Sequence, residues 1–125
     1  MITATSREAN YQVSFSDGVH SALADTTEDK GGGNSGFRPH DLLEAALATC
    51  LSMWLKMYAA NHGISATKVE TKVWIDRSLP DETLFNYAIA ISGDVTEDER
   101  TKLLQVAKTC AVHQTLSKKI SFESA

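Results

Sequence analysis

The sequence has no excess of positive charge and no uninterrupted apolar run long enough to cross a membrane. Its 125 residues include 12 basic and 16 acidic side chains, a net charge of −4, so we expect no broad attraction to nucleic acid or to anionic lipid. The longest apolar stretch, residues 45–60, is interrupted by Lys56 and is short for a membrane span. The N-terminal segment MITATSREANYQ has no basic region followed by an apolar region, so we expect no export signal. These absences favour a cytoplasmic protein that binds neither nucleic acid nor membrane.

The common motifs for phosphate binding, metal proteolysis and serine hydrolysis are also missing. The glycines of residues 25–38 form neither GxxxxGK[ST] nor a GxGxxG after a strand, and there is no HExxH and no GxSxG. Cys110 and His113 have the C-x-x-H spacing of one zinc ligand pair, but structural zinc usually shows two close pairs. The remaining candidate ligands are dispersed: His20, His40 and Cys50. We therefore expect no metal site.

Length and composition predict one globular domain over residues 1–125. Hydrophobic residues make up 42% and charged residues 22% of the chain, which are ordinary values for a folded domain. A chain of this length can bury a core large enough to fold without disulfide bonds or bound metal ions. In the cytoplasm its two cysteines therefore indicate free, catalytic or redox-active thiols more than a structural disulfide.

Alternating apolar and polar residues predict two antiparallel pairs of strands. Asp17-Gly18 predicts a two-residue hairpin turn within the first pair. The glycine-rich loop that follows, residues 25–38, is long enough to be functional or mobile. The predicted strands are residues 10–15, 19–24, 67–76 and 84–92, with a final strand at 119–123.

A long helix is predicted from Pro39 to about Asn61, with Gly63 as its C-terminal stop. Between Leu42 and Ala60 it is apolar on nearly every side, which is typical of a buried helix. One sheet gives such a helix too little cover in so small a chain, so we expect a homodimer that buries two of these helices together.

The remaining elements complete an α+β fold. Thr96 and Glu99 form a capping box at the start of a second helix, which runs to about Lys108. Residues 110–116 are predicted to be a short turn or helix. Because consecutive strands can pair as hairpins, the order of elements predicts antiparallel sheets around a long buried central helix.

The two cysteines are the strongest candidates for chemistry. They are either buried packing residues, since free cysteine behaves as a small hydrophobe, or a nucleophilic thiol with a resolving thiol. A nucleophile must be thiolate at neutral pH, which requires a nearby cation or a helix N-terminus. Helical spacing surrounds Cys50 with apolar side chains, those of Leu43, Leu47, Trp54 and Met57. An activating cation must then come from elsewhere in the fold, and the candidates are Arg38, Arg7 and His113.

Two segments of the chain resemble the signatures of the OsmC/Ohr family. Residues 39–50, PHDLLEAALATC, contain a proline, a polar pair, two large apolar residues, alanine-rich turns and a cysteine. Residues 110–116, CAVHQTL, match the second signature, a cysteine followed by x-V-H-x-T-L. The Met-x-Leu-x-Met-Tyr-Ala stretch after Cys50, and Val19-His20 followed by Asp25, are similar to the general OsmC-like branch. The order of elements agrees along essentially the whole chain.

The resemblance implies the OsmC-like fold, an intertwined homodimer with two long central helices back to back. It implies that Cys50 is the peroxidatic cysteine, which reduces an organic hydroperoxide, and that Cys110 resolves it to a disulfide. A thiol reductant of the dithiol or lipoyl type would reopen that disulfide, with no metal or organic cofactor, in oxidative-stress defence. The pocket residues that would bind substrate are His40, Leu43, Leu47, Trp54 and Met57.

The chain departs from the family's peroxidases beside the helix start. His40, followed by Asp41, stands where those peroxidases have a glutamate that orients a catalytic arginine. Arg38 is the first candidate for that arginine, and Arg7 is the second. The missing glutamate also favours an alternative function: a non-enzymatic dimer that binds a small apolar ligand in its inter-subunit pocket, with the cysteines as a redox switch or packing residues.

Overall fold

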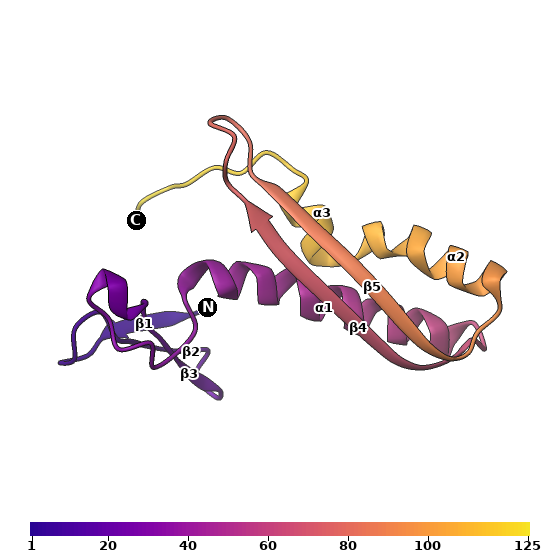
Figure 1. Cartoon of the computed structure of the whole chain (residues 1–125), viewed down its shortest axis with the longest axis horizontal. Coiled ribbons are helices and arrows are strands. Elements are labelled where there is room, and N and C mark those ends of the chain that lie inside the picture. Colours follow the sequence, from indigo (N-terminus) through magenta and orange to yellow (C-terminus); the bar gives the residue numbers. More distant parts are fainter. The chain divides into compact units, whose positions relative to one another are not determined.

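Five strands, three α-helices and two short 3₁₀ helices make up an α+β fold (Figure 1). This computed structural model describes all residues, Met1–Ala125. Internal contacts form two compact units, Met1–Leu43 and Glu44–Ala125. Both sheets are antiparallel, as the sequence predicts.

The first unit contains a three-stranded sheet with the order β1-β2-β3. Its strands are β1 (Thr3–Ser6), β2 (Val13–Ser16) and β3 (Ser21–Ala24). β1 was not predicted, because its sequence, TATS, has no apolar alternation and the strand exists only through its pairing with β2. The predicted strand at residues 10–15 begins too early, since Tyr11 has a φ of +64° and lies in a turn.

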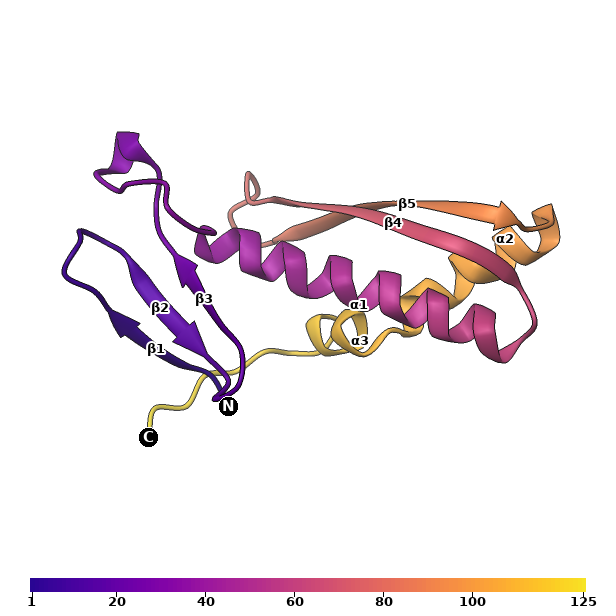
Figure 2. The ribbon, with the colours of Figure 1, turned by 90° about the horizontal axis from the view of Figure 1, so that it is seen from below.

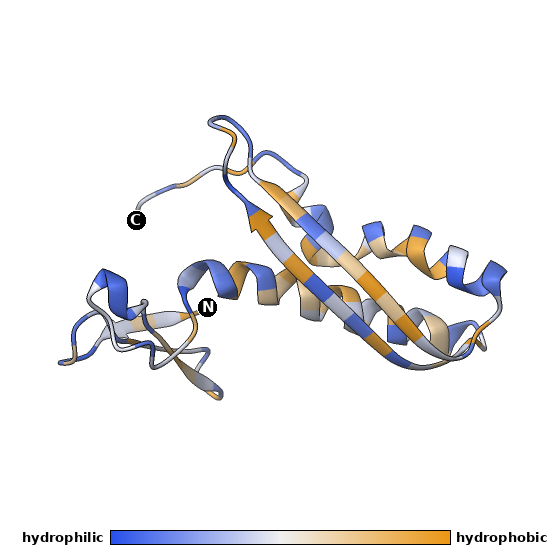
Figure 3. Cartoon of the chain, in the orientation of Figure 1, coloured by the Kyte–Doolittle hydropathy of each residue, from blue (hydrophilic) through white to orange (hydrophobic).

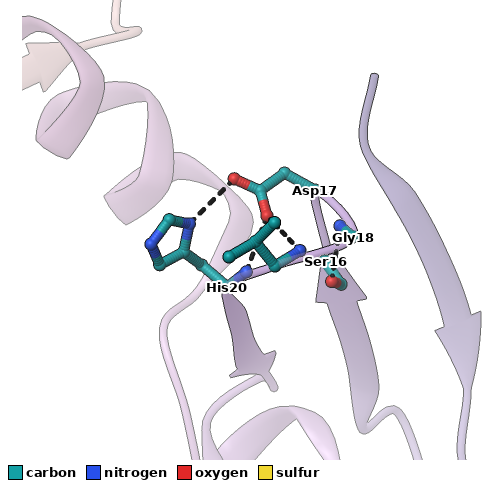
Figure 4. A network of polar contacts seen from close by, with 5 residues as sticks. Ser16, Asp17, Gly18 and His20 are labelled. Atoms are coloured by element: carbon teal, nitrogen blue, oxygen red, sulfur yellow. Dashed lines mark hydrogen bonds and ion pairs between the residues drawn. The ribbon is translucent and has the colours of Figure 1, made fainter.

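The connection between β2 and β3 is a four-residue loop, Asp17–His20, and not the predicted two-residue turn. Its register pairs Ser16 with Ser21. The Asp17 carboxylate holds the loop together (Figure 4), because it accepts hydrogen bonds from the backbone N–H groups of Val19 (2.9 Å) and His20 (2.7 Å) and lies 3.0 Å from the His20 Nδ1. The His20 backbone bond is the largest of the contacts that lower the pKa of Asp17 to about 2.

The loop from Asp25 to Arg38 is organised by one buried carboxylate. Asp25 is only 2% exposed and accepts hydrogen bonds from the backbone N–H groups of Thr26, Gly33 and Ser35. These bonds, that of Ser35 first, lower the pKa of Asp25. The loop contains a 3₁₀ helix, η1 (Glu28–Lys30), and ends where Phe37 forms a parallel bridge with Ala24.

The second unit begins within the long helix α1 (Pro39–Asn61) and continues through β4 (Ser65–Asp76) and β5 (Leu84–Asp94). The helix has the predicted bounds. The two strands form a hairpin that lies beside α1 (Figure 2) and crosses it obliquely (Figure 1). Alternation along β4 is confirmed by its burial pattern, in which Val69, Val73 and Ile75 are half-buried and their neighbours exposed. The same striping is visible in Figure 3.

Three short helical elements close the second unit: α2 (Glu97–Val106), η2 (Ala107–Thr109) and α3 (Ala111–Leu116). The predicted capping box is present, with Glu99 N–H donating to Thr96 Oγ1 and Thr96 N–H donating to the Glu99 carboxylate. The core joins these elements to α1 and the hairpin. Its most buried residues are Leu47, Leu51, Leu55, Ala59, Leu103, Ala107 and Cys110.

One expectation about this unit is corrected by the structure. Residues 119–123 form no strand, because neither sheet pairs with them. In the single chain α1 is buried along one face only, and Met53 and Met57 on another face are 61% and 57% exposed. None of the helices is both long and apolar enough to traverse a bilayer.

Candidate functional site: a cysteine pair beside an apolar groove

Cys50 lies in the middle of α1, three turns from its start, and its thiol is half-buried. Its Sγ accepts a hydrogen bond from the backbone N–H of Val112, at 3.4 Å. Val112 belongs to the first turn of α3, where backbone N–H groups have no partner within the helix. The fold therefore brings a hydrogen-bond donor to Cys50 from a segment far away in sequence.

Cys110 lies at the junction between η2 and α3 and is fully buried, with 0% exposure. It is the N-cap residue of α3, and its Sγ accepts a hydrogen bond from the backbone N–H of His113, at 3.4 Å. Burial raises the pKa of the Cys110 thiol, and the neighbouring Cys50 raises it further, against the opposing effect of the backbone N–H groups. Cys110 is consequently held as a neutral thiol at neutral pH.

The first turn of α3 contacts both sulfur atoms. Each sulfur accepts one backbone N–H, from Val112 or from His113, and both cysteines are free thiols. The site therefore combines an accessible sulfur, Cys50, with a buried sulfur close behind it, which is the arrangement that disulfide chemistry requires.

An apolar groove of about 490 Å³ opens at Cys50. Its walls come from α1 and from the start of α3, and they are Ala46, Thr49, Cys50, Met53, Trp54, Met57, Ala111 and Val112. Three of these side chains carry polar groups: the Cys50 thiol, the Thr49 hydroxyl and the indole N–H of Trp54. The indole N–H is already engaged, because it donates to Thr109 Oγ1 and to the Val106 carbonyl. Such a surface suits an apolar molecule with a reactive group at one end.

The predicted apolar pocket residues lie in three different places in this structure. Trp54 and Met57 line the groove at Cys50. Leu47 is 2% exposed and lines instead a smaller cavity of about 180 Å³, together with Phe85, Tyr87, His113, Leu116 and Ser117. Leu43 is 46% exposed and belongs to the first unit.

The three candidate cations lie in different surroundings. The His113 ring contacts the edge of Tyr87, with 6.0 Å between ring centroids, and its Nδ1 lies 3.4 Å from Ser117 Oγ. Arg38 and Arg7 belong to the first unit, as does His40, the second residue of α1. The role of either arginine toward Cys50 stays a prediction.

Arg38 is held by Asp41. The guanidinium Nε and Nη2 donate to the two carboxylate oxygens at 3.1 and 2.7 Å, and the Arg38 backbone N–H donates to the same carboxylate at 3.0 Å. The Arg38 side chain is the largest cause of the lowered pKa of Asp41. A two-point pair of this kind fixes the plane of the guanidinium as well as its position.

The sequence did not reveal that the first turn of α3 supplies the donors to both sulfurs. The sequence carries no strong signal for this, because Cys110 is the N-cap of α3 while serine, threonine, aspartate and asparagine are the usual N-cap residues. The position of Thr109 against Trp54 was also not predicted. No three His, Cys, Asp or Glu side chains come together in a group that could hold a metal ion.

The fold and the site together define a class: an α+β protein in which a cysteine of a long helix meets a second cysteine at the start of a short one. The family model for OsmC-like proteins matches residues 31–125. The chain belongs to the OsmC-like family, and the resemblance found in the sequence is confirmed.

Solved structures of other proteins share this fold. The OsmC-like protein from Mycoplasma pneumoniae superposes with a TM-score of 0.80 at 22% identity, over 93% of this chain and 85% of that one. The organic hydroperoxide resistance protein OsmC from Legionella pneumophila gives 0.67 at 20% identity, over 94% and 88%. The organic hydroperoxide resistance protein OhrB of Bacillus subtilis gives 0.65 at 18% identity, over 95% and 90%. No curated protein matches the chain in sequence.

Proposed function

We propose that this protein is a cysteine-based reductase of organic hydroperoxides, with Cys50 as the nucleophile and Cys110 as the resolving thiol. The observation that carries the proposal is the meeting of two free thiols at an apolar groove, where Cys50 is accessible and Cys110 is buried behind it. Two of the solved structures described above belong to proteins named for organic hydroperoxide resistance, which supports the same chemistry.

The first step consumes the peroxide. The Cys50 thiolate attacks the terminal oxygen of ROOH, an S–O bond forms, and the O–O bond breaks. The alkoxide that leaves takes up the proton released by the Cys50 thiol, which yields ROH and a sulfenic acid.

The second step closes a disulfide, and a third step restores the enzyme. The Cys110 sulfur attacks the Cys50 sulfur, the S–S bond forms, and hydroxide leaves and combines with the Cys110 proton as water. An external dithiol, of the lipoyl or a similar type, then reduces the disulfide by two successive exchanges and becomes a disulfide itself. The sum is one hydroperoxide and one dithiol converted to an alcohol, water and an oxidised dithiol.

The proposal gives Arg38 the task of stabilising the Cys50 thiolate, with Arg7 as the other candidate. Arg38 is the first candidate because it directly precedes the helix that carries Cys50, and Asp41 holds its guanidinium in one orientation through two hydrogen bonds. Arg38→Lys would keep the charge and lose that geometry. We expect Arg38→Lys to slow the oxidation of Cys50, whereas Arg7→Lys would leave it unchanged if Arg38 is the residue used.

Active protein is proposed to be a homodimer in which part of the exposed apolar surface of α1 is covered by the partner. Met53 and Met57 support this assembly, because they are mostly exposed in the single chain and lie beside the groove. Covering them would also complete the walls of the groove and shield a bound hydroperoxide from water.

The experiment that tests the function is a thiol titration of pre-reduced protein before and after one equivalent of cumene hydroperoxide, with hydrogen peroxide in parallel. We expect both thiols to disappear rapidly with the organic peroxide. Cys110→Ser should accumulate a sulfenic acid on Cys50, and Cys50→Ser should retain its remaining thiol. Survival of both thiols in the wild-type protein, or full turnover by Cys50→Ser, would refute the proposal.

A second candidate function is a non-enzymatic dimer that binds a small apolar ligand. It is favoured by a hollow of about 750 Å³ in the first unit, whose lining is mostly apolar and includes Tyr11, Val13, Phe15, Pro39 and Leu42. Native mass spectrometry of freshly purified protein distinguishes the two. A co-purified apolar ligand together with thiols inert to peroxide would support the binding function.

A further inference from the structure

Thr109, the residue directly before the resolving cysteine, is attached to α1 by a side-chain hydrogen bond. The indole Nε1–H of Trp54 donates to Thr109 Oγ1 at 2.9 Å and to the Val106 carbonyl at 3.1 Å. Thr109 Oγ1 itself donates to the same Val106 carbonyl at 2.6 Å. The three groups form a closed triangle of hydrogen bonds between α1 and the segment where α2 ends and η2 follows.

This triangle lies one helical turn from the nucleophile. Cys50 and Trp54 are four residues apart on α1 and therefore share a face. On the opposing segment Thr109 adjoins Cys110, whose backbone N–H donates to Ala107 at 3.2 Å. Two consecutive turns of α1 thus hold the 106–112 segment: Trp54 through Thr109, and Cys50 through the Val112 N–H.

The two attachments differ in what oxidation does to them. The Val112 contact ends on the Cys50 sulfur, which changes its charge and gains an oxygen when it reacts with peroxide. The Trp54–Thr109 contact involves neither sulfur and is untouched by that reaction. Of these two hydrogen-bonded attachments, only the Trp54–Thr109 contact keeps its strength while the sulfenic acid on Cys50 waits to react with Cys110.

We propose that Thr109, held by Trp54, is a positioning residue for disulfide closure: it keeps Cys110 beside Cys50 after Cys50 has been oxidised. The inference rests on the proposed function for its biological meaning. Closing a disulfide depends on the effective concentration of the attacking thiol, which the attachment raises. Because the Thr109 side chain is exposed, replacing it should leave the core intact.

The test uses no peroxide and measures two reactions separately: the attack of Cys50 on a disulfide reagent, and the closure of the protein disulfide by Cys110. One equivalent of 5,5′-dithiobis(2-nitrobenzoate) reacts with the Cys50 thiolate, forming a mixed disulfide and releasing one nitrothiobenzoate. Cys110 then attacks the Cys50 sulfur, forms the protein disulfide and releases the second nitrothiobenzoate, while the thiol proton goes to solvent. The two absorbance steps report the two reactions in one trace.

We expect Thr109→Val to slow the second release about fivefold, as the loss of one or two modest hydrogen bonds predicts, with the first release unchanged. Thr109→Ser keeps the hydroxyl and should restore closure. Trp54→Phe should also slow the second release, measured against the first release of the same variant. The double variant, Trp54→Phe with Thr109→Val, should release the second nitrothiobenzoate no more slowly than the slower of the two single variants. Trp74→Phe, on the exposed face of β4, is the matched tryptophan control.

Closure by Thr109→Val at the wild-type rate would overturn the inference. So would an equal slowing of both releases, because that pattern indicates a loosened fold and not a misplaced Cys110. Repeating the comparison with cumene hydroperoxide separates this inference from the proposed function. If the wild-type thiols ignore the peroxide but Thr109→Val still closes slowly, the positioning role stands and the peroxidase proposal fails.

Discussion

The Cys50 sulfur accepts a hydrogen bond from the backbone N–H of Val112, 62 residues further along the chain. This contact joins the middle of α1 to the first turn of α3, in which Cys110 is the N-cap. The accessible sulfur and the buried sulfur therefore both accept backbone N–H groups from the same helical turn. The chemistry proposed for the protein depends on that junction more than on either cysteine alone.

The two thiols should differ in reactivity toward an alkylating agent. Because burial raises the pKa of Cys110 above its ordinary value of 9.0, iodoacetamide at neutral pH should modify Cys50 first and Cys110 many times more slowly. Raising the pH above that ordinary value should accelerate modification of Cys110. Mass spectrometry of the two cysteine peptides over time measures both rates. Equal rates at neutral pH would contradict the burial of Cys110.

Gly93 and Gly63 offer a matched pair for testing the β4–β5 hairpin. Both have positive φ, +119° and +64°, but a Cβ at Gly93 would lie 2.2 Å from the Ser65 carbonyl oxygen, whereas a Cβ at Gly63 would meet nothing within 4 Å. Gly63→Ala should lower the free energy of unfolding by about 1 kcal/mol, the cost of the left-handed conformation. Gly93→Ala should cost about 2–4 kcal/mol, because a clash with backbone is added. Urea denaturation measures both, and equal losses would show that the strand pairing relaxes freely at Gly93.

The carboxylate of Asp25 should make the stability of the protein depend on acid pH. Its pKa in the folded protein lies below its ordinary value of 3.8, so the ionised form stabilises the fold above that value. This contribution is lost as the pH falls through the lowered pKa. Asp25→Asn should therefore be less stable than wild type at neutral pH, and the difference should shrink in strong acid.

Urea unfolding midpoints at about pH 7 and about pH 2.5 test the Asp25 prediction. Asp81→Asn, in the exposed turn between β4 and β5, is the control. A difference between Asp25→Asn and wild type that stays constant across this range would mean that the ionisation of Asp25 does not contribute to the stability of the fold.

The exposed methionines of α1 test the proposed dimer. Met57→Glu should cost little in a single chain, where the side chain is 57% exposed, but it would bury a charge in a helix-to-helix interface and dissociate the dimer. Light scattering after size-exclusion chromatography reads the mass directly. Lys102→Glu on α2, whose side chain is exposed, is the control for a charge change. A monomeric wild type, or a dimeric Met57→Glu, would refute this assembly.

The elements that the sequence predicted well are those with strong local signals. The bounds of α1 were predicted from Pro39 to Asn61, since a proline begins the helix and Gly63 follows its end. The capping box at Thr96 and the alternation along β4 and β5 were also correct, because capping and pleating are decided by residues close together in the chain. Motifs ending or beginning on Cys50 and Cys110 were sufficient to indicate the OsmC-like family.

Predictions failed where structure depends on a partner strand or on loop geometry. β1 has no apolar pattern of its own, and residues 119–123 have such a pattern but no strand beside them in either sheet. The Asp17-Gly18 pair indicated a tight turn, yet the Asp17 carboxylate stabilises a loop of four residues by accepting the N–H groups of Val19 and His20. Alternative strand pairings and alternative turn conformations differ by small free energies. Local sequence therefore does not decide which of them forms.

The sequence by itself determined the two thiols, the long helix that carries Cys50 and the short helix that follows Cys110. Only the tertiary structure decided which backbone donors reach the two sulfurs, that Cys110 is buried and Cys50 accessible, and that Trp54 binds Thr109. The physical reason is that spacing along one helix is fixed by its 3.6-residue period. The approach of α2 and η2, which lead into Cys110, to α1 is set by packing among Leu47, Leu51, Leu103 and Ala107, which no short segment encodes.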